Sequence, residues 1–336
     1  MDSITEISVT TTAPGTFTIA WPPAFSPEPV SICASSAPDT LAQADPLVTD
    51  AVGQCTLAGF APDARPYFRL RRTNGEDLIV AERNVPLAGA VNFRDLGGYA
   101  AIDGRRVRWG RLFRSGHLSS LTPAGRTAFE RLGIATVCDF RLASERAREN
   151  MTLPAGVTLE GIEIPPGVRD PEYFHRVFRD ASGPDDVADA VHEVVLSMVN
   201  ESADRYRRLF EVLLEPGERN ILINCSAGKE RTGIATALLL SALGVPRETI
   251  YYDFMLSAVY FPALAEIPRV LEKYAVSAVG DAAQRLVMPL LETRASYLQV
   301  AFDSIDRECG NTDAFLRSHY DLGPAECNEL RRRYLA

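Results

Sequence analysis

The sequence predicts an α/β protein in two parts: a small all-β segment over residues 1–88 and an α/β domain over residues 89–336. The length of 336 residues fits about two domains. Short runs of β-branched and aromatic residues fill the first part, whereas strand patterns alternate with helix patterns in the second, which favours a largely parallel sheet. Hydrophobic residues make up 46% of the chain and charged residues 24%, as in ordinary globular proteins.

Short strands are expected in the first part, with turn residues between them. Asn74–Gly75 lies between the last two strands and is a strong hairpin signal. Short antiparallel strands of this kind predict a small sandwich of the immunoglobulin or fibronectin-III type. The segment lacks convergent polar groups, so we expect an accessory or positioning role for it. The expected strands are residues 7–10, 17–21, 30–33, 65–70 and 78–81.

The second part carries clear signals for its helices and strands. Thr122 is the expected N-cap of a helix that has Pro123 at its first position. Asp139 lies near the end of a short apolar strand. From Pro246 onward the chain is expected to be nearly all helical, with apolar stripes that pack into the core. The main expected elements are a strand over 135–140, a helix over 203–214, a strand over 220–224 and a helix over 232–243.

Charge and cysteine content exclude several classes of protein. The net charge of −9, from 35 basic and 44 acidic residues, argues against a sequence-independent nucleic-acid binder. The first residues have no signal-peptide pattern, and the longest apolar stretch falls short of the roughly 20 residues of a membrane helix, so we expect a cytoplasmic protein without stable membrane insertion. Six cysteines without a Cys-x-x-Cys pair and four scattered histidines predict free thiols and no metal or other cofactor.

The chemistry is concentrated where a buried strand ends at Cys225 and a helix begins after a glycine-containing turn, with Arg231 six positions later. The turn leaves backbone N–H groups free at the positive end of a helix, which makes a site suited to a phosphate dianion. The same field favours thiolate over thiol and makes Cys225 a nucleophile. The planar guanidinium of Arg231 binds two phosphate oxygens. The expected phosphate-binding residues are Ser226, Ala227, Gly228, Lys229, Glu230 and Arg231, with Asn224 and Thr232 in supporting positions.

Two other interpretations of this spacing fail. A second Cys-x5-Arg segment, Cys327 to Arg333, has no glycine and a helical pattern throughout, so we interpret it as structural. A nucleotide-binding P-loop needs glycine at position 223 and serine or threonine after the lysine. The chain has Ile223 and Glu230 at those positions, which excludes that motif.

Four segments stand in the order found in one known family. They are residues 92–98 (NFRDLGG), 112–116 (LFRSG), 139–141 (DFR) and 224–233 (NCSAGKERTG). Together they resemble the bacterial tyrosine/serine protein phosphatases, a dual-specificity and phosphoinositide-capable family that includes the mycobacterial protein tyrosine phosphatase B, whose loop reads His-Cys-x-x-Gly-Lys-Asp-Arg-Thr-Gly. The resemblance covers residues 85–336 and leaves the N-terminal β segment outside.

The resemblance implies a two-step mechanism that needs no metal. Cys225 would attack phosphorus and form a cysteinyl phosphate, and Arg231 with the loop amides would bind the phosphoryl oxygens. Asp139 is then the expected general acid, at the sheet edge where open α/β folds carry their sites. The alternative for Asp139 is a salt bridge to Arg141 or a helix cap.

Two further expectations come from the same resemblance. Lys229 adds a positive charge to the loop, which the resemblance links to activity on phosphoinositides as well as phosphopeptides. The alternative is a solvated loop lysine, and Lys273 is the one other lysine in the chain. The aromatic-rich helices over residues 251–294 are expected to form a lid over the pocket, with plain core packing as the alternative.

Two positions depart from the family pattern. Asn224 replaces the histidine before the cysteine, and a neutral amide orients the loop through hydrogen bonds but provides no imidazolium charge. We therefore expect the Cys225 thiolate to be less favoured than in members with histidine. Glu230 replaces the loop aspartate and is one methylene longer, which makes Asp139 the preferred general acid.

The leading interpretation is a cysteine-dependent phosphomonoester hydrolase. Its expected partners are a phosphorylated protein or a phosphoinositide as substrate and inorganic phosphate as product. Phosphotyrosine, phosphoserine or phosphothreonine, and phosphoinositides all fit one anion site, so the substrate stays open, as does the oligomeric state. One alternative is a phosphate-recognising pseudophosphatase that binds without turnover. Another is a rhodanese-type sulfur-transfer loop, which does not need the Gly-Lys-x-Arg-Thr-Gly continuation.

Overall fold

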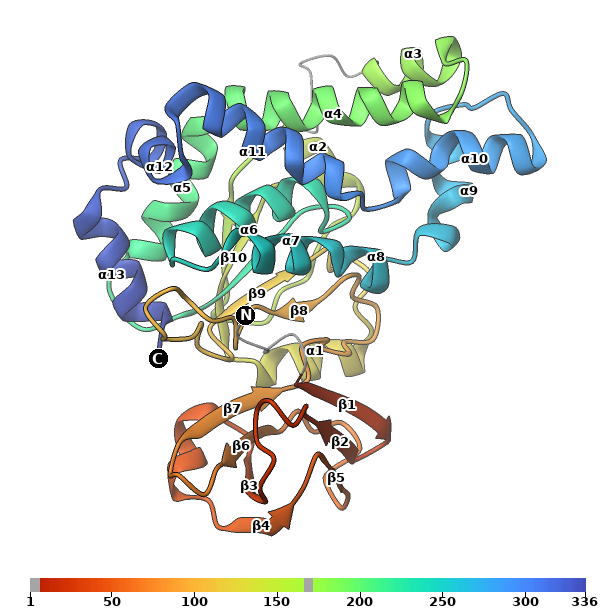
Figure 1. Ribbon diagram of the computed structural model, residues 1–336. Helices are drawn as coiled ribbons and strands as arrows, with labels where there is room; N and C mark the ends of the chain where they lie inside the picture. Colours follow the sequence, from red (N-terminus) through yellow and green to blue (C-terminus); the bar gives the residue numbers. More distant parts are fainter. Residues whose placement is uncertain (1–6, 166–171) are drawn as a thin grey trace.

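A computed structural model of the chain describes residues 7–165 and 172–336. Figure 1 shows two antiparallel sheets at one end of the molecule and a third sheet, covered by helices, at the other. The first two sheets belong to the N-terminal part, and the third carries the cysteine loop. The mixed α/β class predicted from the sequence is therefore confirmed.

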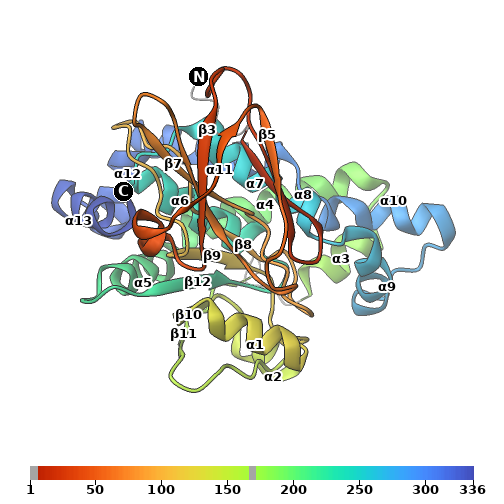
Figure 2. The same cartoon turned by 90° about the horizontal axis from the view of Figure 1, so that it is seen from below.

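The N-terminal strands form a three-stranded sheet in the order β1-β2-β5 and a four-stranded sheet in the order β4-β3-β6-β7. Side chains from both sheets, among them Ile19, Ile32 and Phe68, share one apolar core. Figure 2 shows these strands from below, in front of the helical part. The strands are β1 (Ser8–Ala13), β2 (Thr16–Ala20), β3 (Val30–Ser35), β4 (Pro46–Ala51), β5 (Gln54–Leu57), β6 (Tyr67–Arg71) and β7 (Asp77–Ala81), with a 3-10 helix, η2, at Pro38–Gln43.

Two of these strands were not expected from the sequence. Strands β4 and β5 lie at the outer edges of their sheets, and most of their residues are exposed or half-buried. Edge strands of this kind carry little apolar alternation, which is the signal that sequence patterns depend on. The hairpin at Asn74–Gly75 is confirmed: β6 pairs with β7, and Gly75 has a φ of +85°.

The central sheet has the order β11-β10-β12-β9-β8. Its three inner pairings are parallel and only β8 runs antiparallel to its neighbour, as the alternating pattern predicted. The register places Asp139 opposite Asn224, and Asn224 opposite Ser115, at the carboxyl ends of three adjacent strands. The strands are β8 (Arg94–Asp95), β9 (Leu112–Ser115), β10 (Ile134–Asp139), β11 (Thr158–Gly161) and β12 (Asn220–Asn224).

Helices cover this sheet, and the expected ones are present. Thr122 caps α1 by accepting a hydrogen bond from Gly125 N at 3.1 Å, and the chain after Pro246 is helical. The helices are α1 (Pro123–Arg131), α2 (Ala143–Arg148), α3 (Tyr173–Asp180), α4 (Pro184–Glu201), α5 (Ala203–Leu214), α6 (Glu230–Ala242), α7 (Arg247–Met255), α8 (Ser257–Tyr260), α9 (Ala263–Lys273), α10 (Gly280–Leu291), α11 (Ala295–Cys309), α12 (Thr312–Tyr320) and α13 (Pro324–Tyr334).

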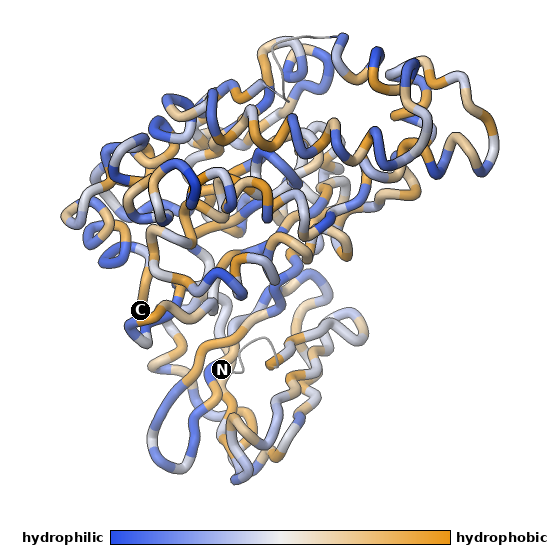
Figure 3. Tube along the Cα trace, turned by 45° about the horizontal axis from the view of Figure 1, so that its top comes forward, coloured by the Kyte–Doolittle hydropathy of each residue, from blue (hydrophilic) through white to orange (hydrophobic). Residues whose placement is uncertain are grey.

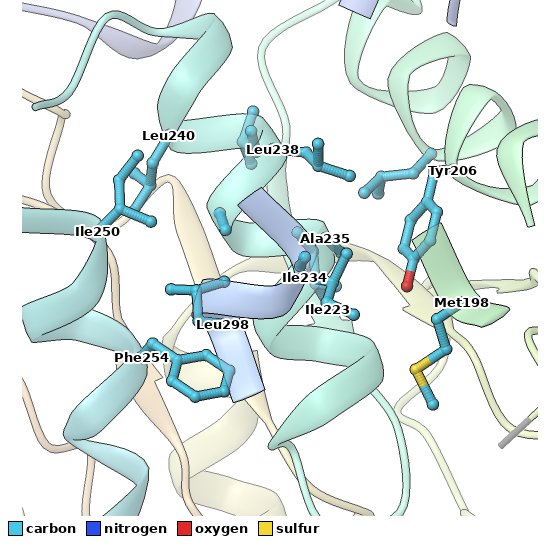
Figure 4. Close-up of a cluster of buried hydrophobic side chains, with 14 of the residues drawn as sticks. Met198, Tyr206, Ile223, Ile234, Ala235, Leu238, Leu240, Ile250, Phe254 and Leu298 are labelled. Atoms are coloured by element: carbon cyan, nitrogen blue, oxygen red, sulfur yellow. The ribbon is translucent and has the colours of Figure 1, made fainter. Parts of the chain in front are cut away.

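Helix α6 runs through the middle of the largest apolar core. Figure 4 shows its side chains between those of α4, α5, α7 and α11. Ile234 and Leu238 of α6 lie in the same cluster as Phe254 of α7 and Leu298 of α11. A helix packed on so many faces is held firmly, so the loop that begins it has a rigid support.

The N-terminal part contacts the α/β part through specific polar groups. Arg65 pairs with the fully buried Asp95 of β8 at 2.8 Å. The indole Nε1 of Trp109 donates to the carbonyl oxygen of Ile79 in β7 at 2.9 Å. Trp109 also packs with Tyr67 in a small apolar cluster. These contacts join the N-terminal part to β8 and to the loop that leads into β9.

Hydropathy alternates along the helices rather than filling one long segment, as the tube in Figure 3 shows. Within residues 7–165 and 172–336, no single helix has the length and apolar character to cross a membrane. One bent pair, α7–α8 with α9, meets those two criteria together, with an angle of 77° at the break.

Candidate active site

Cys225 follows the last residue of β12 and lies inside the turn that leads to α6. Its side chain is 2% exposed, and the backbone N–H of Gly228 donates to its sulfur at 3.2 Å. Gly228 has a φ of +70°, and a Cβ at this position would lie 2.5 Å from the backbone nitrogen of Gly116. Only glycine permits this close approach, as the sequence predicted. The strand, the turn and the helix thus hold the thiol next to a backbone N–H at the start of α6.

Arg231 lies in the first turn of α6 and is 6% exposed. Its guanidinium donates to both carboxylate oxygens of Glu145, at 2.7 and 3.0 Å, and to Ser226 Oγ at 3.1 Å. Burial disfavours the cation, but the nearby sulfur of Cys225 and the carboxylate of Glu145 outweigh burial and raise the pKa of Arg231. The structure therefore brings Cys225, Ser226 and Arg231 together as predicted, with a permanent positive charge beside the thiol.

Glu145 of α2 was not predicted from the sequence. Besides its two bonds from Arg231, its carboxylate accepts a bond from Ser226 Oγ at 2.8 Å. Burial acts to raise the pKa of Glu145, but Arg231 outweighs burial and lowers it to about 2. Glu145 is thus ionised and fixes the plane of the guanidinium. It lies 86 positions from Arg231 along the chain, and no local pattern connects the two.

Asp139, the expected general acid, is paired with Arg141 in this structure. The side chain is 0% exposed. Its oxygens accept bonds from the backbone N–H of Arg141 at 3.0 Å and from Arg141 Nη2 at 2.9 Å. Arg141 in turn donates to the carbonyl oxygen of Glu149 at 2.8 Å. The carboxylate of Asp139 is therefore committed to a buried salt bridge, the alternative considered above.

Lys229 is neither a substrate-binding cation nor a solvated loop lysine in this structure. It is 2% exposed, and burial lowers its pKa. Its ammonium donates to the carbonyl oxygens of Leu290, Leu291 and Glu292 at 2.9, 2.6 and 2.8 Å. It also lies 4.9 Å from the centroid of the Phe261 ring. Lys229 thus caps the carboxyl end of α10 and ties that helix to the phosphate loop.

This contact bears on the expected lid. The end of α10 lies against the loop through Lys229, whereas Phe254 and Phe261 of the same region are buried in the core. Part of the region from α7 to α10 is therefore core, and the end of α10 contacts the phosphate loop; the lid itself stays a prediction. Tyr252, at 39% exposed, faces outward.

Three other positions in and beside the loop are Asn224, Glu230 and Thr232, which the sequence predicted to support the site or bind phosphate. Asn224 is 0% exposed, but its amide contacts Met151 Sδ at 3.8 Å, and its Oδ1 has no hydrogen-bond partner among the described residues. The expected orientation of the loop by the Asn224 amide is therefore wrong. Glu230 Oε1 lies 3.5 Å from Lys229 Nζ, and the hydroxyl of Thr232 is buried without a partner in the described chain.

The second Cys-x5-Arg segment lies within α13, as predicted. Cys327 is half-buried, and burial raises its pKa, so it is a poor nucleophile. All six cysteines are free. Within the described ranges, one group of potential metal ligands converges, Glu308, Cys309 and His319, with ligand atoms within 4.8 Å of one another. None of these residues belongs to the cysteine loop.

The chain is similar to known tyrosine phosphatases. Residues 85–336 match the model of the tyrosine phosphatase family. A Cupriavidus necator protein named "Putative tyrosine-protein phosphatase" is 34% identical, over 73% of this chain and 86% of its own. The triple specificity protein phosphatase PtpB of Mycobacterium tuberculosis is 31% identical, over 76% of this chain and 98% of its own. The core catalytic domain of the PP-IP phosphatase SIW14 from S. cerevisiae has a TM-score of 0.27 at 12% identity, over 64% of this chain and 91% of that one.

The family match covers three quarters of the chain and includes the whole cysteine loop. The chain belongs to the tyrosine phosphatase family. It is accordingly a protein-tyrosine-phosphatase-type hydrolase of phosphomonoesters, as the motifs at positions 92–98, 112–116 and 224–233 predicted.

Proposed function

We propose that Cys225 is the nucleophile of this hydrolase and that it passes through a cysteinyl-phosphate intermediate. The observation that carries the proposal is the enclosure of the Cys225 sulfur, which accepts a hydrogen bond from Gly228 N at the start of a buried helix. In the first step the sulfur–phosphorus bond forms and the bond from phosphorus to the ester oxygen breaks. In the second step water attacks phosphorus, the sulfur–phosphorus bond breaks, and inorganic phosphate leaves.

In this mechanism Arg231 and the amides of residues 226–231 bind the phosphoryl oxygens. Glu145 orients Arg231, because its two carboxylate oxygens engage two guanidinium nitrogens in a planar arrangement. Ser226 joins both side chains through its hydroxyl. The loop and α2 therefore act as one anion-binding unit, and Glu145 is a positioning residue in it.

We assign the general acid to Glu230 rather than to Asp139. Glu230 lies in the loop next to Arg231, and its buried Oε1 has the ammonium of Lys229 at 3.5 Å as its neighbour. In its protonated form a carboxyl group in that position gives its proton to the leaving oxygen, and the resulting carboxylate takes one from the attacking water. Asp139 is held by Arg141 and has no such freedom.

Leaving groups of different basicity test this assignment. We expect Glu230→Gln to lower kcat for phenyl phosphate about 100-fold, and far less for 2,4-dinitrophenyl phosphate, whose leaving group needs no proton. Asp139→Asn serves as the matched variant and is expected to affect both substrates alike. The assignment is wrong if Asp139→Asn shows the leaving-group dependence and Glu230→Gln does not.

The substrate is proposed to be a phosphorylated protein or a phosphoinositide. The relative from M. tuberculosis is named a triple specificity phosphatase, which supports a broad choice. A panel of phosphotyrosine peptides, phosphoserine peptides and phosphoinositides, each assayed by phosphate release, tests the choice. Cys225→Ser is the control for the whole mechanism: it should abolish turnover of an aryl phosphate. Binding of phosphate without turnover by the unaltered protein would favour the pseudophosphatase alternative.

We further propose that residues 1–88 form an accessory domain of the immunoglobulin or fibronectin-III type and that residues 89–336 form the catalytic domain. Two antiparallel sheets around one apolar core support the first assignment. The start of the family match at residue 85 supports the boundary. Limited proteolysis tests it, with cleavage between the two parts as the expected result.

A further inference from the structure

A cluster of buried charges contacts the phosphate loop from β8, β9 and α7. Arg94 of β8, Arg114 of β9 and Asp253 of α7 are each no more than 1% exposed. Arg114 Nη1 lies 2.5 Å from Asp253 Oδ2, and Arg94 Nε lies 3.2 Å from Asp253 Oδ1. Tyr99 OH donates to the same Oδ1 at 3.0 Å. Two cations thus share one anion.

All three groups are charged at neutral pH. Burial, together with the neighbouring Arg114, lowers the pKa of Arg94 to about 10, which still leaves it protonated. Burial acts to raise the pKa of Asp253, but Arg94 and Arg114 outweigh burial and lower it to about 2. One step further out, Arg83 lies 3.9 Å from the centroid of the Tyr99 ring. It adds positive charge, so the cluster holds a surplus cation.

The cluster donates hydrogen bonds to two carbonyl groups of the phosphate loop. Arg114 Nη2 donates to the carbonyl oxygen of Gly228 at 2.9 Å. Asn92 Nδ2 donates to the same oxygen at 3.0 Å and to the carbonyl oxygen of Ala227 at 3.2 Å. Asn92 is itself bound by Arg94, and its backbone has a φ of +55°. Both carbonyls are therefore held on the side of the buried cluster.

The direction of a carbonyl sets the direction of the N–H group in the same peptide. In a planar trans peptide the two point in opposite directions. The peptide whose carbonyl belongs to Ala227 has Gly228 N as its other end, and that N–H donates to Cys225 Sγ at 3.2 Å. Arg114 and Asn92 hold the carbonyl oxygen of Gly228 on the side of the cluster. The N–H of Lys229 belongs to the same peptide, so it points to the opposite side, as the N–H of Gly228 does. Asn92 and Arg114 thus aim two amides at the anion site.

Each cation nearer the thiol has an acidic side chain as a neighbour. Arg231 is paired with Glu145, and Lys229 lies beside Glu230. The cluster behind the loop adds net positive charge to this region, in a chain that has Asn224 where the family pattern has histidine.

We propose that Arg114, balanced by Asp253 and assisted by Asn92, is the positioning group of the phosphate loop and supplies the positive charge that Asn224 does not. The proposal rests on Cys225 as nucleophile. Arg114 touches only the back of the loop, so it acts through the Gly228 peptide and through its field, and not on the substrate.

The test compares variants with opposite changes in charge. The readout is the pH profile of Cys225 alkylation by iodoacetamide in the intact protein, read by peptide mass spectrometry, together with inhibition by inorganic phosphate. We expect Arg114→Gln to shift the midpoint of the profile upward by at least about half a pH unit and to weaken phosphate inhibition. We expect Asp253→Asn to shift it downward. A purely structural role would move both variants in the same direction, and that result would overturn the proposal.

Two further variants keep the test decisive if Asp253→Asn does not fold. Asn92→Gly removes the amide at a left-handed position without strain or charge change, so it should slow alkylation at every pH and leave the midpoint unchanged. Arg111 lies next to β9 and pairs with Glu218. Arg111→Gln removes this positive charge and should change neither the alkylation profile nor phosphate inhibition. A midpoint shift in Arg111→Gln equal to that in Arg114→Gln would contradict the proposal. Turnover retained in Cys225→Ser would instead contradict the nucleophile assignment.

Discussion

Replacing Lys229 by methionine is expected to loosen the contact between the phosphate loop and α10. The ammonium of Lys229 donates to three consecutive carbonyl oxygens at the end of that helix, at 2.9, 2.6 and 2.8 Å. Methionine retains an apolar stem beside Phe261 but has no donor. The three carbonyls then lose their partner while the packing changes little.

The size of the effect follows from these contacts. A buried carbonyl that loses its partner costs about 1–3 kcal/mol. Leu290 and Glu292 are half-buried, so water restores part of the loss, and removing a buried cation recovers part of its desolvation cost. We expect a net cost of about 2–4 kcal/mol for the closed position of α10, which is about a 30- to 800-fold rise in its opening equilibrium.

Hydrogen exchange read by mass spectrometry measures this opening. Amides near the end of α10 should exchange faster in Lys229→Met by the stated factor, whereas those of β12 should keep their protection. Lys273→Met is the control, because Lys273 is the other lysine of the chain and is exposed on α9. Unchanged exchange in Lys229→Met, or an equal change in Lys273→Met, would refute the reasoning.

Three other predictions concern acid stability, the loop backbone and the N-terminal part. The pKa of Glu145 is about 2 in the folded protein, below the 4.5 that is ordinary for glutamate, so its contribution of about 3 kcal/mol is present above pH 4.5 and is lost as the pH falls toward 2. Glu145→Gln should flatten that part of a urea-unfolding pH series. Gly228→Ala places a Cβ 2.5 Å from a backbone nitrogen and should abolish most turnover. Gly217→Ala is the control, because Gly217 has a φ of +99° and no atom within 4 Å of the added Cβ, so a melting curve of this variant measures the cost of the positive φ alone. Arg65→Met leaves the buried Asp95 without its cation and should lower the free energy of unfolding by about 3–5 kcal/mol; an unchanged urea midpoint would show that the amides of the loop suffice for that carboxylate.

Local patterns predicted the centre of the site. The apolar run before Cys225, the glycine turn and the helix after it are all contained within residues 220–242, and each has its own short-range signal. Helix α6 begins two residues earlier than expected, at Glu230, because the loop turns into the helix without a separate cap side chain. Positions were therefore predictable wherever the chain specifies them within a few turns.

Side-chain direction was not predictable in the same way. The sheet register does place Asp139 opposite Asn224, beside the loop. The carboxylate nevertheless turns back to Arg141, two residues further on. Sequence position defines where a strand residue lies, but the choice of partner depends on which charges are buried nearby.

Long-range contacts account for the other residues that sequence reasoning missed or misread. Glu145 meets Arg231 across 86 positions, and Lys229 meets Leu290 across 61. Arg114 meets Asp253 across 139 positions. Each pair is created by the packing of separate elements around α6, so no window of local sequence contains both partners.

The scarcity of lysine makes the movement of α10 open to chemistry. An amine-reactive ester modifies a lysine only when its nitrogen is solvated and unprotonated. Lys273 meets the first condition at all times, whereas Lys229 meets it only while its nitrogen is released from the end of α10. The two lysines therefore form an internal reference pair. The fraction labelled at Lys229, divided by the fraction labelled at Lys273, measures how often the end of α10 separates from Lys229, in a protein without any substitution.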